Sequence, residues 1–149
     1  MNSFNWDTSF LVDFNLHTGF SETAQVTKRQ LSQMKDMFSD KPAVHSILEK
    51  DDPVIYEFYE LGAPEEAGHL SFGTTILHPG IIGEEYYMTK GHFHTILDTA
   101  EVYYTLKGEG YMVMENPEGD TLEMPLRPGE AIYVPKRYAH RSVNTGREP

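Results

Sequence analysis

The sequence contains no cysteine, so any metal that it binds must be held by nitrogen and oxygen ligands. The absence of thiols also removes the disulfides on which many small secreted domains depend. Basic charge is scarce, and the formal net charge of -11 argues against a general nucleic-acid binder. A small anionic substrate is still compatible with this charge, because a local pocket of N–H and hydroxyl donors is enough to hold it.

Long apolar runs are missing as well. No stretch approaches the length of a membrane span, and residues 1–13 lack the basic segment and apolar core of a signal peptide. We therefore expect a cytoplasmic protein with no membrane partner. The 149 residues fit one domain, and an apolar content of 39% with 12% aromatics is enough to form a core.

The N-terminal third mixes two kinds of pattern. Alternating apolar residues predict a strand over residues 10–16. Residues 26–38 carry apolar side chains at helical spacing, with Thr27 as a candidate cap, and Pro42 ends that pattern. Residues 42–50 then predict a second short helix with proline in its first turn.

From residue 53 onward, short runs rich in β-branched and aromatic residues alternate with turns that contain glycine and proline. This pattern predicts an all-β sandwich or barrel. The expected strands cover residues 54–59, 70–77, 101–106, 111–115 and 131–134.

Three histidines and a glutamate form the candidate metal site. His92 and His94 are two residues apart, a spacing that puts both on one face of a strand. Glu101 opens a later strand on the same face as Tyr103, and His140 follows a proline-led turn. Taken singly, each of these residues fits a surface or packing role equally well. Together they form an N/O donor set suited to Fe(II), Mn(II), Ni(II) or Zn(II).

The combined pattern resembles the cupin family. The two histidines, glutamate and glycine of the first cupin motif correspond to His92, His94, Glu101 and Gly108. The glycine, proline, histidine and asparagine of the second motif correspond to Gly129, Pro135, His140 and Asn144. The gap filled by residues 95–100 is longer than in the common cupin spacing.

That longer gap points to one subfamily. The chain resembles the cupin-type phosphoglucose isomerases of archaea and some bacteria, and the likeness covers most of it from about residue 10. Its central signature reads Thr75-x3-Pro79-x3-Gly83-x-Glu85-x3-Thr89-x-Gly91-His92-x-His94-x6-Glu101-x-Tyr103-x4-Gly108-x-Gly110. Further matching segments are residues 52–57, 133–135 and 139–146.

The resemblance implies an all-β cupin barrel, of the double-stranded β-helix or jelly-roll type, with a short helical N-terminal segment. We expect a single cupin domain over residues 1–149. Residues 1–50 would supply a strand and short helices packing on the barrel, and residues 51–149 the barrel core with the metal site. Family members continue with another strand, so the barrel is expected to lack its last strand or strands.

The resemblance also implies a function. The family interconverts glucose 6-phosphate and fructose 6-phosphate, a step of glycolysis and gluconeogenesis, and forms homodimers. The implied cofactor is a divalent metal, Fe(II) first, with Mn(II), Ni(II) or Zn(II) as alternatives. The implied partner is a sugar phosphate and not a nucleic acid.

Residue by residue, the resemblance implies a metal site and a substrate pocket. Glu101 would also be the catalytic base. The implied metal ligands are His92, His94, Glu101 and His140. The implied substrate contacts are Tyr56, Thr75, Thr89, Gly91 and Tyr103.

Several alternatives stay open at this point. Hydrogen transfer between C1 and C2 can follow a cis-enediol route, which we favour, or a metal-assisted hydride shift. The same donor set would also serve a cupin oxygenase, or a sugar-phosphate-binding cupin without catalysis. Gly83 is expected in a turn of unusual dihedrals, and Glu85 is expected to orient a ligand histidine or a substrate hydroxyl.

Overall fold

A computed structural model describes residues 4–149 of the chain, so residues 1–3 of the expected domain lie outside the described part. The elements run in the order β1 Gln25–Gln30, α1 Leu31–Met34, the short 3-10 helix η1 Lys35–Met37, α2 Lys41–Leu48, β2 Val54–Glu60, β3 Gly73–Leu77, β4 Ile81–Ile82, β5 Glu85–Tyr86, β6 Glu101–Tyr104, β7 Gly110–Glu115, β8 Thr121–Leu126, β9 Ala131–Val134 and β10 Ala139–Asn144. None of the helices in the described residues is long and apolar enough to cross a membrane.

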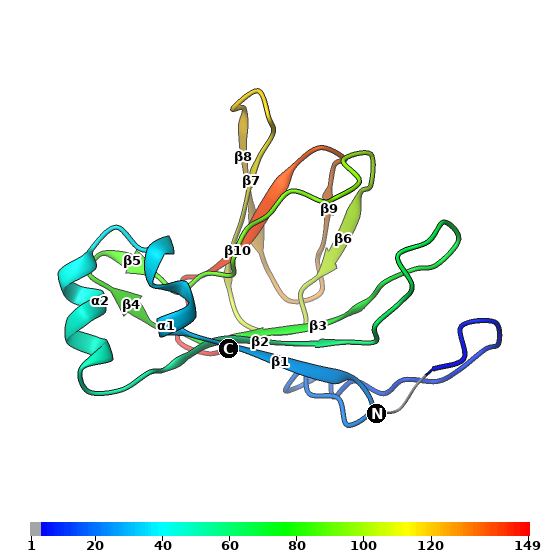
Figure 1. Ribbon diagram of the computed structural model, residues 1–149, viewed down its shortest axis with the longest axis horizontal. Helices are drawn as coiled ribbons and strands as arrows, with labels where there is room; N and C mark the ends of the chain where they lie inside the picture. The colour runs from blue at the N-terminus through cyan, green and yellow to red at the C-terminus, as the bar shows by residue number, and fades with distance from the viewer. Residues whose placement is uncertain (1–3) are drawn as a thin grey trace.

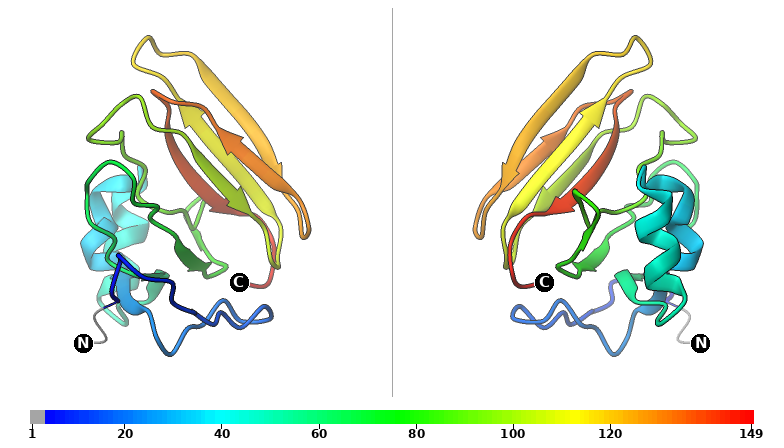
Figure 2. Two further views of the ribbon diagram at one scale, coloured as in Figure 1. Left: turned by 90° about the vertical axis from the view of Figure 1, so that its right-hand side faces the viewer. Right: turned by 90° about the vertical axis from the view of Figure 1, so that its left-hand side faces the viewer.

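The strands form antiparallel sheets around a central hollow. One sheet has the order β1-β2-β3 and lies along the lower part of Figure 1. The sheet β10-β7-β8 and the pair β6-β9 stand above it, while the hairpin β4-β5 lies beside the two helices (Figures 1 and 2). Residues 4–149 form only two short α-helices against ten strands, so the all-β prediction is confirmed.

The N-terminal segment departs from the sequence-based expectation. The helix expected over residues 26–38 is wrong for its first part, because residues 25–30 pair with β2, for example Lys28 with Glu57. A ladder of interstrand hydrogen bonds outweighs a weak helical pattern here. The strand expected over residues 10–16 is also wrong, since these residues join no ladder.

The second helix agrees with its prediction. Helix α2 begins after Asp40, whose side chain accepts a hydrogen bond of 2.9 Å from the Ala43 N–H. Pro42 lies in the first turn, where its missing N–H costs no helical bond. The buried Val44 turns this helix toward the core.

The buried apolar side chains form two core clusters. The first joins the helices to β2 and the β4-β5 hairpin, and consists of Leu31, Met34, Phe38, Val44, Ile55, Tyr56, Ile82, Tyr87 and Met88. The second fills the space between β7 and β9 with Met112, Met114, Ile132 and Val134. Burial of each such side chain contributes roughly 1.5–3 kcal/mol.

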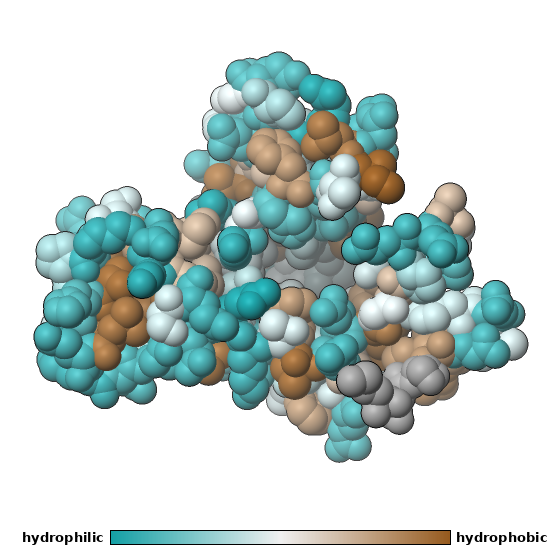
Figure 3. All heavy atoms as spheres, in the orientation of Figure 1, coloured by the Kyte–Doolittle hydropathy of each residue, from teal (hydrophilic) through white to brown (hydrophobic). Residues whose placement is uncertain are grey.

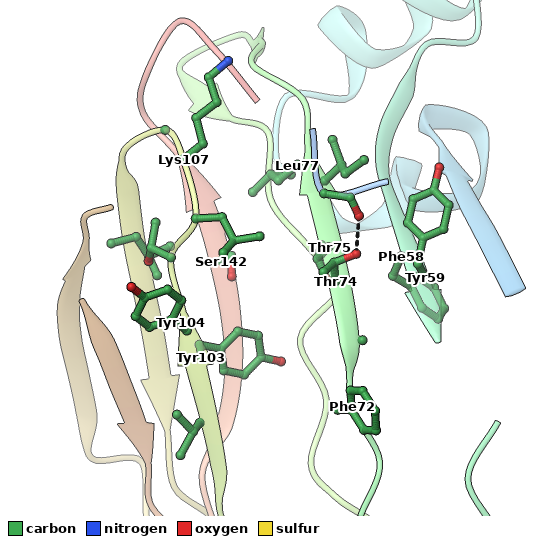
Figure 4. A pocket seen from close by; sticks show the side chains of 18 of the residues that line it. Phe58, Tyr59, Phe72, Thr74, Thr75, Leu77, Tyr103, Tyr104, Lys107 and Ser142 are labelled. Atoms are coloured by element: carbon green, nitrogen blue, oxygen red, sulfur yellow. Dashed lines mark hydrogen bonds between the residues drawn. The ribbon is translucent and has the colours of Figure 1, made fainter. Parts of the chain in front are cut away.

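The hollow between the lower sheet and the strands above it is a partly open cavity. Its volume is about 1070 Å³, just above the range of about 300–1,000 Å³ that is usual for small-molecule sites. The space-filling view shows the recess between the lower sheet and the strands above it (Figure 3). Thr75 of β3 lines one wall, while Tyr103 of β6 and Ser142 of β10 line the other (Figure 4).

Candidate metal centre

Three of the four expected ligands converge on one point. Ligand atoms of His94, Glu101 and His140 all lie within 4.8 Å of one another. Glu101 Oε1 lies 2.9 Å from His94 Nε2, and its Oε2 lies 3.0 Å from His140 Nε2. Glu101 opens β6 and His140 lies in β10, so two separate sheets bring these side chains together.

His92 lies at the rim of this cluster. Its backbone forms an isolated antiparallel bridge with His140. Its ring centroid is 5.9 Å from that of His94 and 6.0 Å from that of His140. His92 is exposed and lines the cavity, so this third imidazole, the fourth expected ligand, approaches the other three ligands from the cavity side.

The donor set fits a divalent cation. His94 Nε2 is buried and has no hydrogen-bond partner within residues 4–149, although Glu101 Oε1 is only 2.9 Å away. The two atoms are therefore in contact without the alignment of a hydrogen bond. A buried imidazole nitrogen without a hydrogen-bond partner, this close to a carboxylate oxygen, can be satisfied by a cation that both atoms bind.

Two opposing effects act on the pKa of Glu101. Burial alone would raise it, but the hydrogen bond from His140, the charges of His140 and His94 and the Tyr103 hydroxyl together lower the pKa below its ordinary value. Glu101 is thus held as the carboxylate, the form that binds a metal ion and accepts a proton.

Tyr103 connects the metal cluster to the cavity. Its hydroxyl lies 2.9 Å from His140 Nε2. Burial, together with the adjacent Glu101 carboxylate, raises the pKa of Tyr103 well above its ordinary value, so the phenol stays protonated. Its hydroxyl points into the open space facing β3 (Figure 4), where it can donate to a bound oxygen.

The expected substrate contacts fall into two groups. Thr75 and Tyr103 line the cavity from opposite walls. Tyr56 is buried in the cluster that joins β2 to the helices. The Thr89 hydroxyl accepts a hydrogen bond of 2.9 Å from the Ser142 N–H, and Gly91 packs against the His140 carbonyl. Tyr56, Thr89 and Gly91 are therefore not among the residues that line the cavity.

Some functional positions were missed from the sequence, and one expected role is different. Ser142 lines the cavity, and its spacing of two from His140 on a strand was the signal that both share a face. Glu85 accepts hydrogen bonds from the Ser39 N–H at 2.7 Å and from its hydroxyl at 3.3 Å. It therefore anchors the segment before α2 and orients no ligand histidine. Gly83 has φ of +61° in the β4-β5 turn, as expected.

Comparison with known proteins identifies the family. The model of the glucose-6-phosphate isomerase (GPI) family matches residues 28–149. The glucose-6-phosphate isomerases of Thermococcus litoralis and Pyrococcus furiosus are 45% and 47% identical over 140 residues, which is 94% of this chain and 74% of each relative. The same enzyme from Sinorhizobium medicae is 37% identical over 136 residues, 90% of this chain and 64% of the relative. The chain therefore belongs to the cupin-type glucose-6-phosphate isomerase family.

Proposed function

We propose that this chain is a metal-dependent aldose–ketose isomerase that interconverts glucose 6-phosphate and fructose 6-phosphate. The observation that carries the proposal is the convergence of His94, Glu101 and His140 beside a cavity of about 1070 Å³, which Glu101 lines. Relatives that are 45% and 47% identical to this chain over 140 residues carry the name of this isomerase.

We assign the metal to His92, His94, Glu101 and His140, with Fe(II) as the expected ion and Mn(II), Ni(II) or Zn(II) as alternatives. Three imidazoles and one carboxylate form a borderline donor set that suits these ions and disfavours Ca(II) and Mg(II). When bound, the metal supplies Lewis-acid polarisation of the sugar oxygens at C1 and C2.

Glu101 is the proposed base. Its lowered pKa keeps it ionised, so it can take the proton from C1 of fructose 6-phosphate and return it to C2. Loss of the C1 proton and protonation of the C2 carbonyl oxygen give a cis-enediol. Protonation of C2 and loss of the C1 hydroxyl proton then give the aldose, and the reaction needs no oxidant. The Tyr103 hydroxyl, held protonated beside Glu101, is placed to donate to a substrate oxygen during this exchange.

We assign the rest of the sugar phosphate to the cavity and its walls. Thr75 and Tyr103 line the cavity from opposite sides, and hydroxyl and backbone N–H donors suit phosphate oxygens. Thr89 and Gly91 lie next to β10, Tyr56 is a buried residue of β2, and none of the three lines the cavity. We propose that these three contribute by supporting the wall or by approaching the substrate when it binds.

The function is tested by incubating metal-loaded protein with fructose 6-phosphate and coupling glucose 6-phosphate formation to a dehydrogenase, with dissolved oxygen followed in parallel. Turnover without oxygen consumption supports the isomerase. Oxygen consumption without glucose 6-phosphate would indicate a cupin oxygenase. Tight sugar-phosphate binding without product would indicate a cupin that binds but does not catalyse.

The hydrogen-transfer route has its own test. In deuterated water, an enediol route puts solvent deuterium at C2 of the glucose 6-phosphate formed from fructose 6-phosphate, because the proton on the base exchanges with solvent. A product that carries no deuterium at C2 would favour the hydride shift.

We also propose that residues 1–149 act as one cupin domain and that the protein is a cytoplasmic homodimer. Strand β1 supports the second part, because it lies at the edge of its sheet with one side unpaired among residues 4–149. Such an edge can pair with a second copy of the chain. Light scattering during size-exclusion chromatography would give twice the mass of 17.0 kDa for the dimer and the single mass for a monomer.

A further inference from the structure

Both ring nitrogens of His94 lie close to a side-chain oxygen, but only Nδ1 has a hydrogen-bond partner among the described residues. Nδ1 lies 2.7 Å from Thr99 Oγ1, and Nε2 lies 2.9 Å from Glu101 Oε1. The His94 side chain is only 14% exposed, so bulk water does not readily replace Thr99 at Nδ1. The hydrogen-bond role of Thr99 therefore decides which nitrogen of His94 carries the proton.

Thr99 has one hydroxyl hydrogen, and it is used in a hydrogen bond to the backbone. Thr99 Oγ1 donates to the Ile96 carbonyl oxygen at 2.8 Å. Because that hydrogen is used, the same oxygen can only accept from His94, and Nδ1 must be the protonated nitrogen. The lone pair of the neutral ring then lies on Nε2, the atom that faces Glu101 and has no hydrogen-bond partner among the described residues.

The segment that carries Thr99 is fixed to the other half of the metal site. The Leu97 carbonyl accepts a hydrogen bond of 2.7 Å from the Arg137 N–H, and Lys136 Nζ lies 3.2 Å from Asp98 Oδ1. The loop before β6 and the turn between β9 and β10 accordingly lie side by side in Figures 1 and 2. Thr99 is thus held at a defined place relative to the strand of His140.

We propose that Thr99 is a positioning residue for the metal centre, fixing His94 in the tautomer whose Nε2 lone pair is available to a divalent cation. The inference rests on the metal site proposed above. It also gives residues 95–100 a physical role, because this loop turns back far enough for its fifth residue to reach the ring of His94. Second-sphere hydrogen bonds of this kind orient a ligand ring and raise its basicity.

The test compares three variants. Thr99→Val keeps the shape of the side chain and removes the acceptor, while Thr99→Ser keeps the hydroxyl. Thr95→Val makes the same chemical change at an exposed threonine of the same loop and serves as the matched control. Because Thr99 is itself exposed, Thr99→Val leaves no buried void.

Two measurements are made on each protein. Long-range ¹H–¹⁵N NMR spectra of the metal-free protein report the tautomer of His94. Calorimetric titration with Mn(II) and Zn(II) reports metal affinity. We expect His94 of the parent protein to be protonated at Nδ1, Thr99→Val to bind both ions about 10- to 100-fold more weakly, and Thr99→Ser and Thr95→Val to bind like the parent.

The outcomes separate this inference from the proposed function. A parent His94 protonated at Nε2 would overturn the role of Thr99, whether or not metal binds. Parent-like affinity in Thr99→Val would also overturn it, and so would an equal loss of affinity in Thr99→Ser or Thr95→Val. If the parent binds neither ion, the metal site itself fails, and the NMR tautomer in Thr99→Val still decides what Thr99 does to His94.

Discussion

His92 and His140 face each other across an isolated antiparallel bridge, although they come from two motifs far apart in the sequence. The bridge brings the backbone before His94 against β10, the strand that carries His140. The geometry of the metal centre therefore depends on how closely these two backbones approach. Substitutions of Gly91 and of the histidine ligands test that dependence.

Gly91→Ala is expected to weaken the metal centre by separating the two backbones. A methyl group at this position would lie 3.1 Å from the His140 carbonyl oxygen and 3.1 Å from Arg141 Nε. The carbonyl belongs to a paired strand and cannot move freely, so we expect a loss of about 1 kcal/mol in unfolding free energy. Denaturant unfolding and metal titration measure the effect. Unchanged stability and affinity would contradict the close approach.

The ligands are expected to differ in how much each contributes to metal affinity. His94→Ala and His140→Ala each remove one of the three converging ligands and should lower metal affinity by at least about 100-fold. His92→Ala removes the exposed ring at the rim and should cost less, about tenfold. Calorimetry measures the affinities, and circular dichroism checks that each variant is folded. Equal losses for all three would contradict this ranking.

Glu57→Gln is expected to destabilise the protein in a pH-dependent way. The Glu57 side chain is 14% exposed and contacts Lys28 Nζ and His78 Nε2, each at 3.2 Å. Burial acts to raise its pKa, but these two partners outweigh burial and lower it. A lowered pKa in the folded state stabilises the fold above the ordinary glutamate pKa of about 4.3, and this contribution is lost as pH falls through the folded value.

We therefore expect Glu57→Gln to be about 1 kcal/mol less stable than the parent at pH 7, with the difference disappearing near pH 3. Glu60→Gln, at an exposed position of the same strand, is the control and should show little difference at either pH. The measurement is urea unfolding at both pH values. A difference for Glu57→Gln that persists or grows at low pH would contradict the sign of the shift.

Arg137 is the non-glycine residue with positive φ, at 71°, in the described part of the chain. Arg137→Gly and Arg137→Ala both remove the 2.7 Å ion pair with Glu118, but only glycine relieves the left-handed backbone. The glycine variant is therefore expected to be about 1 kcal/mol more stable than the alanine variant. Thermal unfolding compares them. Equal stabilities would mean that the turn has no such strain.

Much of the fold follows from local pattern. Residues 131–134 form β9 as predicted, and the aromatic run at 54–59 forms β2, because β-branched and aromatic side chains fit a half-buried sheet. The strand β8 was not predicted because Pro125 and Glu123 are unusual in a strand, and they are tolerated at the edge of the sheet. Pairing of residues 25–30 with β2 depends on a distant partner that local pattern does not contain.

The site was predicted less evenly. The convergence of His94, Glu101 and His140 agrees with the ligands that the family resemblance implies. Strand β10 was not predicted as a strand, because its polar residues face the site and not an apolar core. Asn144 shows this, since its side chain donates to the Leu77 carbonyl at 2.8 Å. The contact between Thr99 and His94 depends on the conformation of the loop between them, which no periodic pattern in the sequence predicts.

The central claim, a metal-dependent isomerase, is tested most directly by removing the metal. The protein is stripped with a chelator, assayed for conversion of fructose 6-phosphate to glucose 6-phosphate, and assayed again after addition of Fe(II), Mn(II), Ni(II) or Zn(II). We predict that kcat falls by at least about 100-fold on stripping and is restored by at least one of these ions. Full activity in protein shown by elemental analysis to be free of metal would contradict the claim.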